Sequence, residues 1–199
     1  ESRVGVLALQ GASAAHLAAF ARLGVAAREI RAPHELERLT HLVLPGGEST
    51  TLHHLLTLFD LWQPLRERHL AGELALFGTC AVAILLSRSC GGKPPTMGLL
   101  DAEVERNAYG RQSDSFTRTL ELAEDERGPA RPFPAVFIRA PRFTSVGPDV
   151  RVLARLEDHA PVALQAPALL ATTFHPELTD ELGFHARFLA LAPEVSTAR

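Results

Sequence analysis

The chain has 199 residues, of which 46% are hydrophobic and 22% are charged, a composition typical of a globular protein. Its formal net charge of −3 gives no strong basic field, so neither a nucleic-acid partner nor a membrane surface is predicted. The sequence contains no run of about 18 apolar residues, so no membrane span is predicted. The length suits one domain covering residues 1–199.

The first half of the chain alternates apolar strands with helices. The pattern predicts strands over 3–11, 25–32, 41–47 and 74–79, and helices over 12–24, 49–59, 64–72 and 81–89. Glu48 or Ser49 is placed to cap the second of these helices, and Pro64 suits the first turn of the third. This alternation predicts an α/β three-layer sandwich with a mostly parallel central sheet, in which sites form at the carboxyl ends of strands.

The second half contains mostly strands, which we expect to extend the sheet and to form antiparallel hairpins. These strands are predicted over 99–107, 115–122, 135–141, 150–158, 161–166 and 168–175, with loops over 90–96 and 124–134. A helix over 179–192 closes the chain, with acidic residues in its first turn.

The only two cysteines are Cys80 and Cys90, too few for a disulfide framework. The first residues lead directly into a strand and not into a signal-peptide pattern, so we expect a cytoplasmic protein. The sequence contains no His-x-x-x-His or Cys-x-x-Cys spacing, and no metal site is predicted.

Cys80 lies in "FGTCA" (77–81), at the bend between a predicted strand and a predicted helix. A nucleophile elbow has this arrangement, which lifts the side chain clear of the sheet. The helix amides that follow, beginning at Ala81, favour a thiolate and offer a donor to a developing oxyanion. The alternative is a small buried core residue, which is a common environment for cysteine.

His175 and Glu177 lie in "TTFHPELT" (172–179), where another predicted strand ends. Side chains two residues apart on an extended chain point the same way, so Glu177 could orient the imidazole of His175 toward Cys80. The alternative is a surface turn without a role.

The third motif is "LPGGEST" (44–50), which lacks the lysine of a phosphate-binding loop. Glycine permits close backbone approach, so the N–H groups of Gly46 and Gly47 could face a reacting carbonyl. The alternative is a tight turn followed by a capped helix.

Together these motifs resemble those of the class I glutamine amidotransferase family, which has a flavodoxin-like fold and hydrolyses glutamine with a Cys-His-Glu triad. More narrowly, the chain resembles the glutaminase subunits of glutamine-dependent pyridoxal 5′-phosphate synthases, which serve vitamin B6 biosynthesis. The blocks that carry this resemblance are "LALQGA" (7–12), "LPGGESTT" (44–51), "FGTCA" (77–81), "ERNAYGRQSDSF" (105–116), "FIRAP" (137–141) and "FHPELT" (174–179).

The resemblance implies that Cys80 is the nucleophile, that His175 is the general base and acid, and that Glu177 orients it. It also implies a set of residues that contact L-glutamine: Gly47, Glu48, Ser49, Arg106, Ile138 and Arg139. The planar fork of an arginine suits the α-carboxylate of an amino acid.

By the same resemblance, the ammonia passes to a (β/α)₈ synthase subunit within a large hetero-oligomer. Pyridoxal phosphate would be a product of that complex, so no cofactor is expected in this chain. We expect the partner to complete an oxyanion hole formed by Gly46, Gly47 and Ala81.

One position departs from the family pattern, because Val82 stands where the elbow usually has a second glycine. We expect this side chain either to push the helix outward or to be accommodated by the small neighbours Ala81 and Ala83. Three alternatives stay open: a subunit of another amidotransferase, such as one serving imidazole glycerol phosphate synthesis; a non-catalytic binding subunit; and a cysteine hydrolase of esters or peptides.

Overall fold

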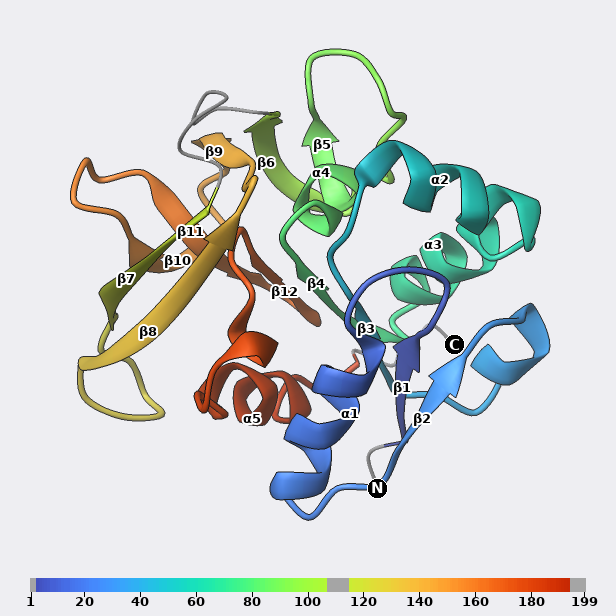
Figure 1. The fold of residues 1–199 in the computed structure, drawn as a ribbon. Coiled ribbons are helices and arrows are strands. Elements are labelled where there is room, and N and C mark those ends of the chain that lie inside the picture. The colour runs from blue at the N-terminus through green and yellow to red at the C-terminus, as the bar shows by residue number, and fades with distance from the viewer. Residues whose placement is uncertain (1–2, 107–114, 194–199) are drawn as a thin grey trace.

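The computed structural model describes residues 3–106 and 115–193. Its central sheet has seven strands in the spatial order β10-β11-β12-β4-β3-β1-β2 (Figure 1). Along the chain these strands are β1 (Val4–Leu7), β2 (Ala27–Ile30), β3 (His41–Leu44), β4 (Ala75–Thr79), β10 (Arg151–Arg155), β11 (Pro161–Ala166) and β12 (Leu169–Thr172).

Five of these strands run parallel, because β2, β1, β3, β4 and β12 pair with one another in parallel register. The other two, β11 and β10, pair antiparallel and form one edge of the sheet. The prediction of a mostly parallel sheet is therefore confirmed. Parallel pairing also brings the carboxyl ends of β3, β4 and β12 to the same edge, next to one another.

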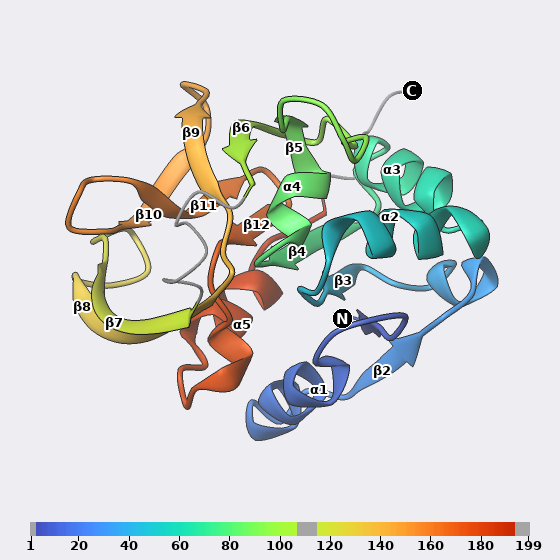
Figure 2. The same ribbon diagram turned by 45° about the horizontal axis from the view of Figure 1, so that its top comes forward.

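Helices cover both faces of the central sheet (Figures 1 and 2). They are α1 (Ser13–Arg22), α2 (Ser49–Leu58), α3 (Trp62–Leu70), α4 (Val82–Leu86) and α5 (Gly183–Leu189), with short 3₁₀ helices η1 (Pro33–Leu36) and η2 (Pro176–Leu178). Successive strand residues face opposite sides, so Phe77 packs with α1 and α5 while Leu76 packs with α2, α3 and α4. The three-layer sandwich is confirmed.

Two small sheets also lie outside the central one, one with the order β5-β6-β9 and the other pairing β7 with β8. The predicted antiparallel pairing is present between β6 and β9 and between β7 and β8, whereas β5 pairs parallel with β6. Their strands are β5 (Ser87–Ser89), β6 (Leu100–Glu105), β7 (Ser115–Leu122), β8 (Arg131–Ile138) and β9 (Arg142–Val146).

Two boundaries in this part of the chain were predicted wrongly. The helix expected over 81–89 ends at Leu86, because Ser87 is extended and its hydroxyl donates to the carbonyl of Ile84 at 2.7 Å. The loop expected over 124–134 ends earlier, because β8 begins at Arg131 and includes Pro132 and Pro134. Prolines two residues apart place their nitrogens on the same side of the strand, where a two-stranded sheet has a free edge.

The C-terminal helix begins at Gly183, later than predicted, and no acidic residue lies in its first turn. Glu181 precedes the helix and binds Arg131 at 2.8 Å. Residues Pro176–Leu178 form η2 and are not extended. In residues 3–106 and 115–193, no helix has both the length and the apolar character needed to cross a membrane.

Candidate active site

Three segments that follow adjacent parallel strands meet at the carboxyl edge of the sheet. Gly46 and Gly47 follow β3, Cys80 follows β4 directly, and His175 lies shortly after β12. The register pairs Thr79 with Thr172 across β4 and β12, so these segments leave the sheet side by side. Residues far apart in the sequence therefore reach one site.

Cys80 occupies the sharp turn between β4 and α4. Its φ of +50° lies in the left-handed region, which is costly for a residue with a side chain and is typical of functional turns. The residue is only 3% exposed, and its thiol donates to the carbonyl oxygen of Ile138 at 3.5 Å. This backbone conformation is the one expected of a nucleophile elbow.

Gly78 provides the room that the Val82 side chain needs. A Cβ atom built on Gly78 would lie 2.6 Å from Cγ1 of Val82. The Val82 side chain therefore occupies the space that a side chain at position 78 would need. Val82 is completely buried. A small neighbour therefore accommodates Val82, and it is Gly78 of β4, which was not among the neighbours named in the prediction.

His175 is held through its backbone and through its ring. Its N–H donates to the carbonyl of Val136 in β8 at 2.8 Å, and its Nδ1 donates to Oε1 of Glu177 at 2.7 Å. Burial lowers the pKa of His175, but hydrogen bonds to Cys80 and Glu177 outweigh this effect and raise it to about 10. The ring therefore lies between a sulfur and a carboxylate that together stabilise its protonated form.

Glu177 reaches His175 from η2, so the expectation of an extended chain between them was wrong although the contact exists. The single 3₁₀ turn brings the carboxylate back beneath the ring. The Glu177 side chain has no exposure to solvent. Burial raises the pKa of Glu177, but His175 and the nearby His16 more than offset this, so the pKa lies below its ordinary value.

Gly46 packs tightly against Cys80 and His175. A Cβ atom on this residue would lie 2.7 Å from Cβ of Cys80 and 3.0 Å from Cε1 of His175, so only glycine fits. Its N–H, however, donates to the hydroxyl of Thr79 at 2.9 Å. This bond must break before Gly46 can donate to an oxyanion, and that role stays a prediction.

Gly47 is covered on one side by Gln10, whose Oε1 would lie 2.5 Å from a Cβ atom on Gly47. The same Oε1 accepts the N–H of Glu48 at 3.1 Å. Ala81 stands at the start of α4 beside Cys80. The oxyanion roles of Gly47 and Ala81 also stay predictions.

A cavity of about 210 Å³ opens above Cys80. The predicted residues that line it are Gly47, Glu48, Ser49, Cys80, Ala81, Arg106, Ile138, Arg139 and His175. Two predicted residues, Glu177 and Gly46, do not line the cavity, because Glu177 lies behind His175 and Gly46 lies below Cys80. Ile84 and Pro141 also line the cavity and were not predicted; Pro141 could have been found, because it ends the "FIRAP" block.

Glu48 and Arg106 form the charged wall of this cavity. The carboxylate of Glu48 caps α2 by accepting the N–H groups of Thr50 and Thr51, and it lies 3.3 Å from Nη2 of Arg106. Arg106 also donates to the carbonyl of Lys93 at 2.8 Å. The wall therefore presents one cationic and one anionic group, which matches the two charges of a free amino acid.

Arg139 and Ser49 complete the predicted set in different ways. Arg139 is exposed, with a φ of +44°, in the turn that follows β8. Ser49 is only 2% exposed and begins α2. The rest of the "RNAYGRQ" block, residues 107–112, falls outside the described residues.

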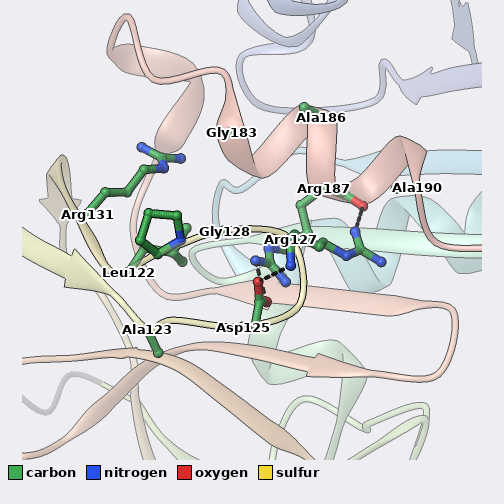
Figure 3. Close-up of a pocket in the computed structure, with 11 residues that line it drawn as sticks. Leu122, Ala123, Asp125, Arg127, Gly128, Arg131, Gly183, Ala186, Arg187 and Ala190 are labelled. Carbon is green, nitrogen blue, oxygen red and sulfur yellow. Dashed lines mark hydrogen bonds and ion pairs between the residues drawn. The ribbon is translucent and has the colours of Figure 1, made fainter.

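A second, larger cavity of about 370 Å³ lies between the β7–β8 hairpin and α5 (Figure 3). Arg127, Arg131 and Arg187 line it, but each guanidinium already has a partner. Arg187 binds Asp125 at 2.6 Å, Arg131 binds Glu181, and Arg127 donates to the carbonyl of Arg187. This cavity offers neither a nucleophile nor an imidazole. Among the residues described, no cluster of His, Cys, Asp and Glu is suited to hold a metal ion.

Comparison with known proteins identifies the family of this chain. The model of the SNO glutamine amidotransferase family matches residues 6–192. A protein of Deinococcus radiodurans named pyridoxal 5′-phosphate synthase subunit PdxT is 53% identical over 197 residues, which cover 96% of this chain and 97% of the relative. A protein of the same name from Thermus thermophilus is 50% identical over 191 residues, covering 95% and 97%.

A solved structure described as a glutamine amidotransferase superposes with a TM-score of 0.86 at 47% identity, covering 94% of this chain and 97% of the other. The prediction of the family and that of the fold are both confirmed. The chain belongs to the SNO glutamine amidotransferase family.

Proposed function

We propose that the protein is the glutaminase subunit of a pyridoxal 5′-phosphate synthase, and that Cys80, His175 and Glu177 are its catalytic triad. The single observation that carries this proposal is that Cys80, in its sharp turn, lies at the carboxyl edge of the sheet together with His175, whose ring is bonded to the Glu177 carboxylate. The names of the relatives and their coverage of almost the whole chain support the identity of the complex.

In the proposed reaction, the Cys80 sulfur attacks the side-chain amide carbon of glutamine. His175 carries the proton that the leaving nitrogen takes up, and ammonia departs while a glutamyl thioester forms. His175 then accepts a proton from water, which attacks the thioester and releases glutamate and the free thiol. Glu177 stabilises the imidazolium in both steps.

The charged wall of the cavity supports glutamine as the substrate. The guanidinium of Arg106 suits the α-carboxylate, and the carboxylate of Glu48 suits the α-ammonium. Gly47, Ser49, Ile138 and Arg139 line the same cavity and complete the proposed binding site. The pair of opposite charges favours a free amino acid over an ester or a peptide.

We propose that the oxyanion site forms only in the complex with the synthase subunit. In the isolated chain the N–H of Gly46 is engaged by Thr79, so a peptide must turn before it can face the substrate. We propose that a (β/α)₈ synthase subunit induces this change within a large hetero-oligomer and receives the ammonia. A cytoplasmic location also stays a prediction, supported by the free thiols of Cys80 and Cys90.

The test is the release of ammonia from glutamine, with and without the synthase subunit. Substitution Cys80→Ala should reduce the rate by about 10⁶-fold if the triad acts as a unit. Cys90→Ala is the matched control, because this second free thiol lies outside the cavity and should leave the rate unchanged. Near-normal activity of Cys80→Ala, or no stimulation by the synthase subunit, would contradict the proposal.

A further inference from the structure

Two buried histidines that the proposed reaction does not use lie behind Glu177. His16 belongs to α1 and His185 to α5, and neither is exposed to solvent. Phe77 packs edge-on against both imidazoles, with ring centroids 6.2 Å from His16 and 5.7 Å from His185. These rings therefore sit in apolar surroundings, where an unpaired polar atom is costly.

The two imidazoles continue the line of polar contacts that begins at His175. Nδ1 of His16 lies 2.8 Å from Nε2 of His185, which is a formed hydrogen bond. On its other side, Nε2 of His16 faces Oε2 of Glu177 at 3.6 Å. Within the part of the chain that the structure describes, neither of these facing atoms has a hydrogen-bond partner.

The distance of 3.6 Å is longer than a formed hydrogen bond. Hydrogen bonds in a catalytic site are often long without substrate and shorten when the substrate binds. A buried nitrogen and a buried carboxylate oxygen that face each other, each otherwise unsatisfied, gain most by closing that gap. We therefore expect Nε2 of His16 and Oε2 of Glu177 to form a hydrogen bond.

The carboxylate also decides which nitrogen of each ring carries the hydrogen. If His16 carried its hydrogen on Nδ1, its bare Nε2 would oppose a negative oxygen, and the Nδ1–H of His185 would be buried without an acceptor. In the other arrangement, His185 Nε2–H donates to His16 Nδ1, and His16 Nε2–H points at Glu177. That arrangement leaves only one bare nitrogen, Nδ1 of His185, which costs less than an orphaned N–H.

Both rings are neutral at neutral pH, as this arrangement requires. Burial lowers the pKa of His16 to about 4, although the nearby Glu177 partly opposes the change. Burial and the neighbouring His16 lower the pKa of His185 to about 3. Each neutral imidazole has a single N–H to donate.

We propose that His16 is a positioning residue for the triad: its Nε2–H holds the second oxygen of Glu177, and His185 fixes the tautomer of His16 that carries this hydrogen. Glu177 is then held on both oxygens, by His175 on Oε1 and by His16 on Oε2. The carboxylate cannot rotate away from the imidazole that it orients. This inference rests on the proposed glutaminase function.

The test compares three substitutions in the complex with the synthase subunit. His16→Leu removes both ring nitrogens and should lower kcat about 10- to 100-fold while KM for glutamine stays within about twofold. His16→Gln restores an amide N–H near the position of Nε2 and should recover most of kcat. His185→Phe leaves His16 in place without its fixed tautomer and should give an intermediate loss.

His41→Leu is the matched control for loss of a buried histidine. His41 is 3% exposed and bonds the carbonyl of Leu191 at 2.8 Å, away from the triad. It should lower the free energy of unfolding without changing kcat. If His16→Leu and His41→Leu give the same kcat, or if His16→Gln recovers nothing, the positioning role is wrong.

A second measurement separates this inference from the proposed function. Iodoacetamide alkylation of Cys80 is followed against pH in the isolated chain, with Cys90→Ala as the background. In His16→Leu the inflection at which His175 loses its proton should move to lower pH, because a loosely held Glu177 stabilises the imidazolium of His175 less. An inflection at the wild-type pH overturns the inference. A wild-type complex that releases no ammonia contradicts the proposed function, while the alkylation profile still tests His16.

Discussion

The two cavities of this protein differ in a way that size does not reveal. The cavity between the hairpin and α5 is the larger, at about 370 Å³ against about 210 Å³, but its arginines are all engaged by neighbouring oxygens. The smaller one contains a strained cysteine and a histidine with a raised pKa, although its arginine, Arg106, is also paired, with Glu48. Paired charges stabilise a fold, whereas strain and a shifted pKa mark the place where chemistry is expected.

Behind the smaller cavity, Glu177 should give the largest effect after that of Cys80→Ala. Glu177→Gln keeps the shape of the side chain but removes the charge that holds His175, so kcat for ammonia release should fall about 10⁴-fold. Glu181→Gln is the control, because this carboxylate pairs with Arg131 beside the larger cavity. Its kcat should stay within about twofold, and a comparable loss in both variants would erase the distinction between the cavities.

A smaller effect is expected where the elbow packs on the sheet. Val82→Gly empties the space beside Gly78 and puts glycine into a helix, so the free energy of unfolding should fall by about 2–4 kcal/mol. Activity should change by less than about tenfold, because Gly78 and Cys80 keep the turn. Urea unfolding and steady-state kinetics measure the two quantities. An inactive but stable variant would show that Val82 takes part in the chemistry.

The larger cavity should respond in stability alone. Asp125→Ala leaves Arg187 without its carboxylate, and the free energy of unfolding should fall by about 1–3 kcal/mol. Glu126→Ala, at an exposed neighbouring carboxylate, should change it by less than about 0.5 kcal/mol. The rate of ammonia release should be unaffected in both. A loss of activity with Asp125→Ala would assign a functional role to this cavity.

As the pH falls, the region behind the smaller cavity should lose stability before the region beside the larger cavity does. The pKa values of His16 and His185 are depressed, so the unfolded chain binds more protons than the folded one below pH 6.5, and stability falls as pH drops from there. Each histidine adds a slope of about 1.4 kcal/mol per pH unit at most. Burial raises the pKa of Asp125, but the Arg127 N–H and Arg187 outweigh it and depress the pKa below 3.8, so its contribution is lost only under stronger acid.

Unfolding curves recorded between pH 4 and 7 measure this slope. His185→Phe should flatten the curve in that window, and Asp125→Ala should leave it unchanged. Equal slopes in the wild type and in His185→Phe would show that the buried histidines do not control acid stability.

The sequence predicts the centre of this fold better than its margins. Short apolar runs that end in glycine or cysteine define β3 and β4, because a strand covered on both faces has few other possible compositions. β5 and β9 were missed, since "SRS" and "RFTSV" are mostly polar and lack the apolar run that predicts a buried strand. Likewise, η2 contains a proline and only three residues, so only the folded structure shows that Glu177 curls back under His175.

The proposed catalytic residues were accessible to prediction because their motifs are local, whereas the residues behind them were not. Cys80 and His175 each follow a recognisable strand end. His16 lies on the buried face of a helix with Ala19 and Phe20, and nothing in that pattern connects it to His185, 169 positions along the chain. Long-range polar pairs of this kind require coordinates.

Cys80 and His175 are both hydrogen-bonded to β8. The carbonyls of Val136 and Ile138, two positions apart on this strand, hold the backbone of His175 and the thiol of Cys80 respectively. The β7–β8 ribbon is a separate sheet, but Phe133 and Phe137 of β8 share a buried cluster with Leu170 of the central sheet. One strand therefore helps to position both the sulfur and the imidazole, so a change in the packing of β8 would displace both groups together.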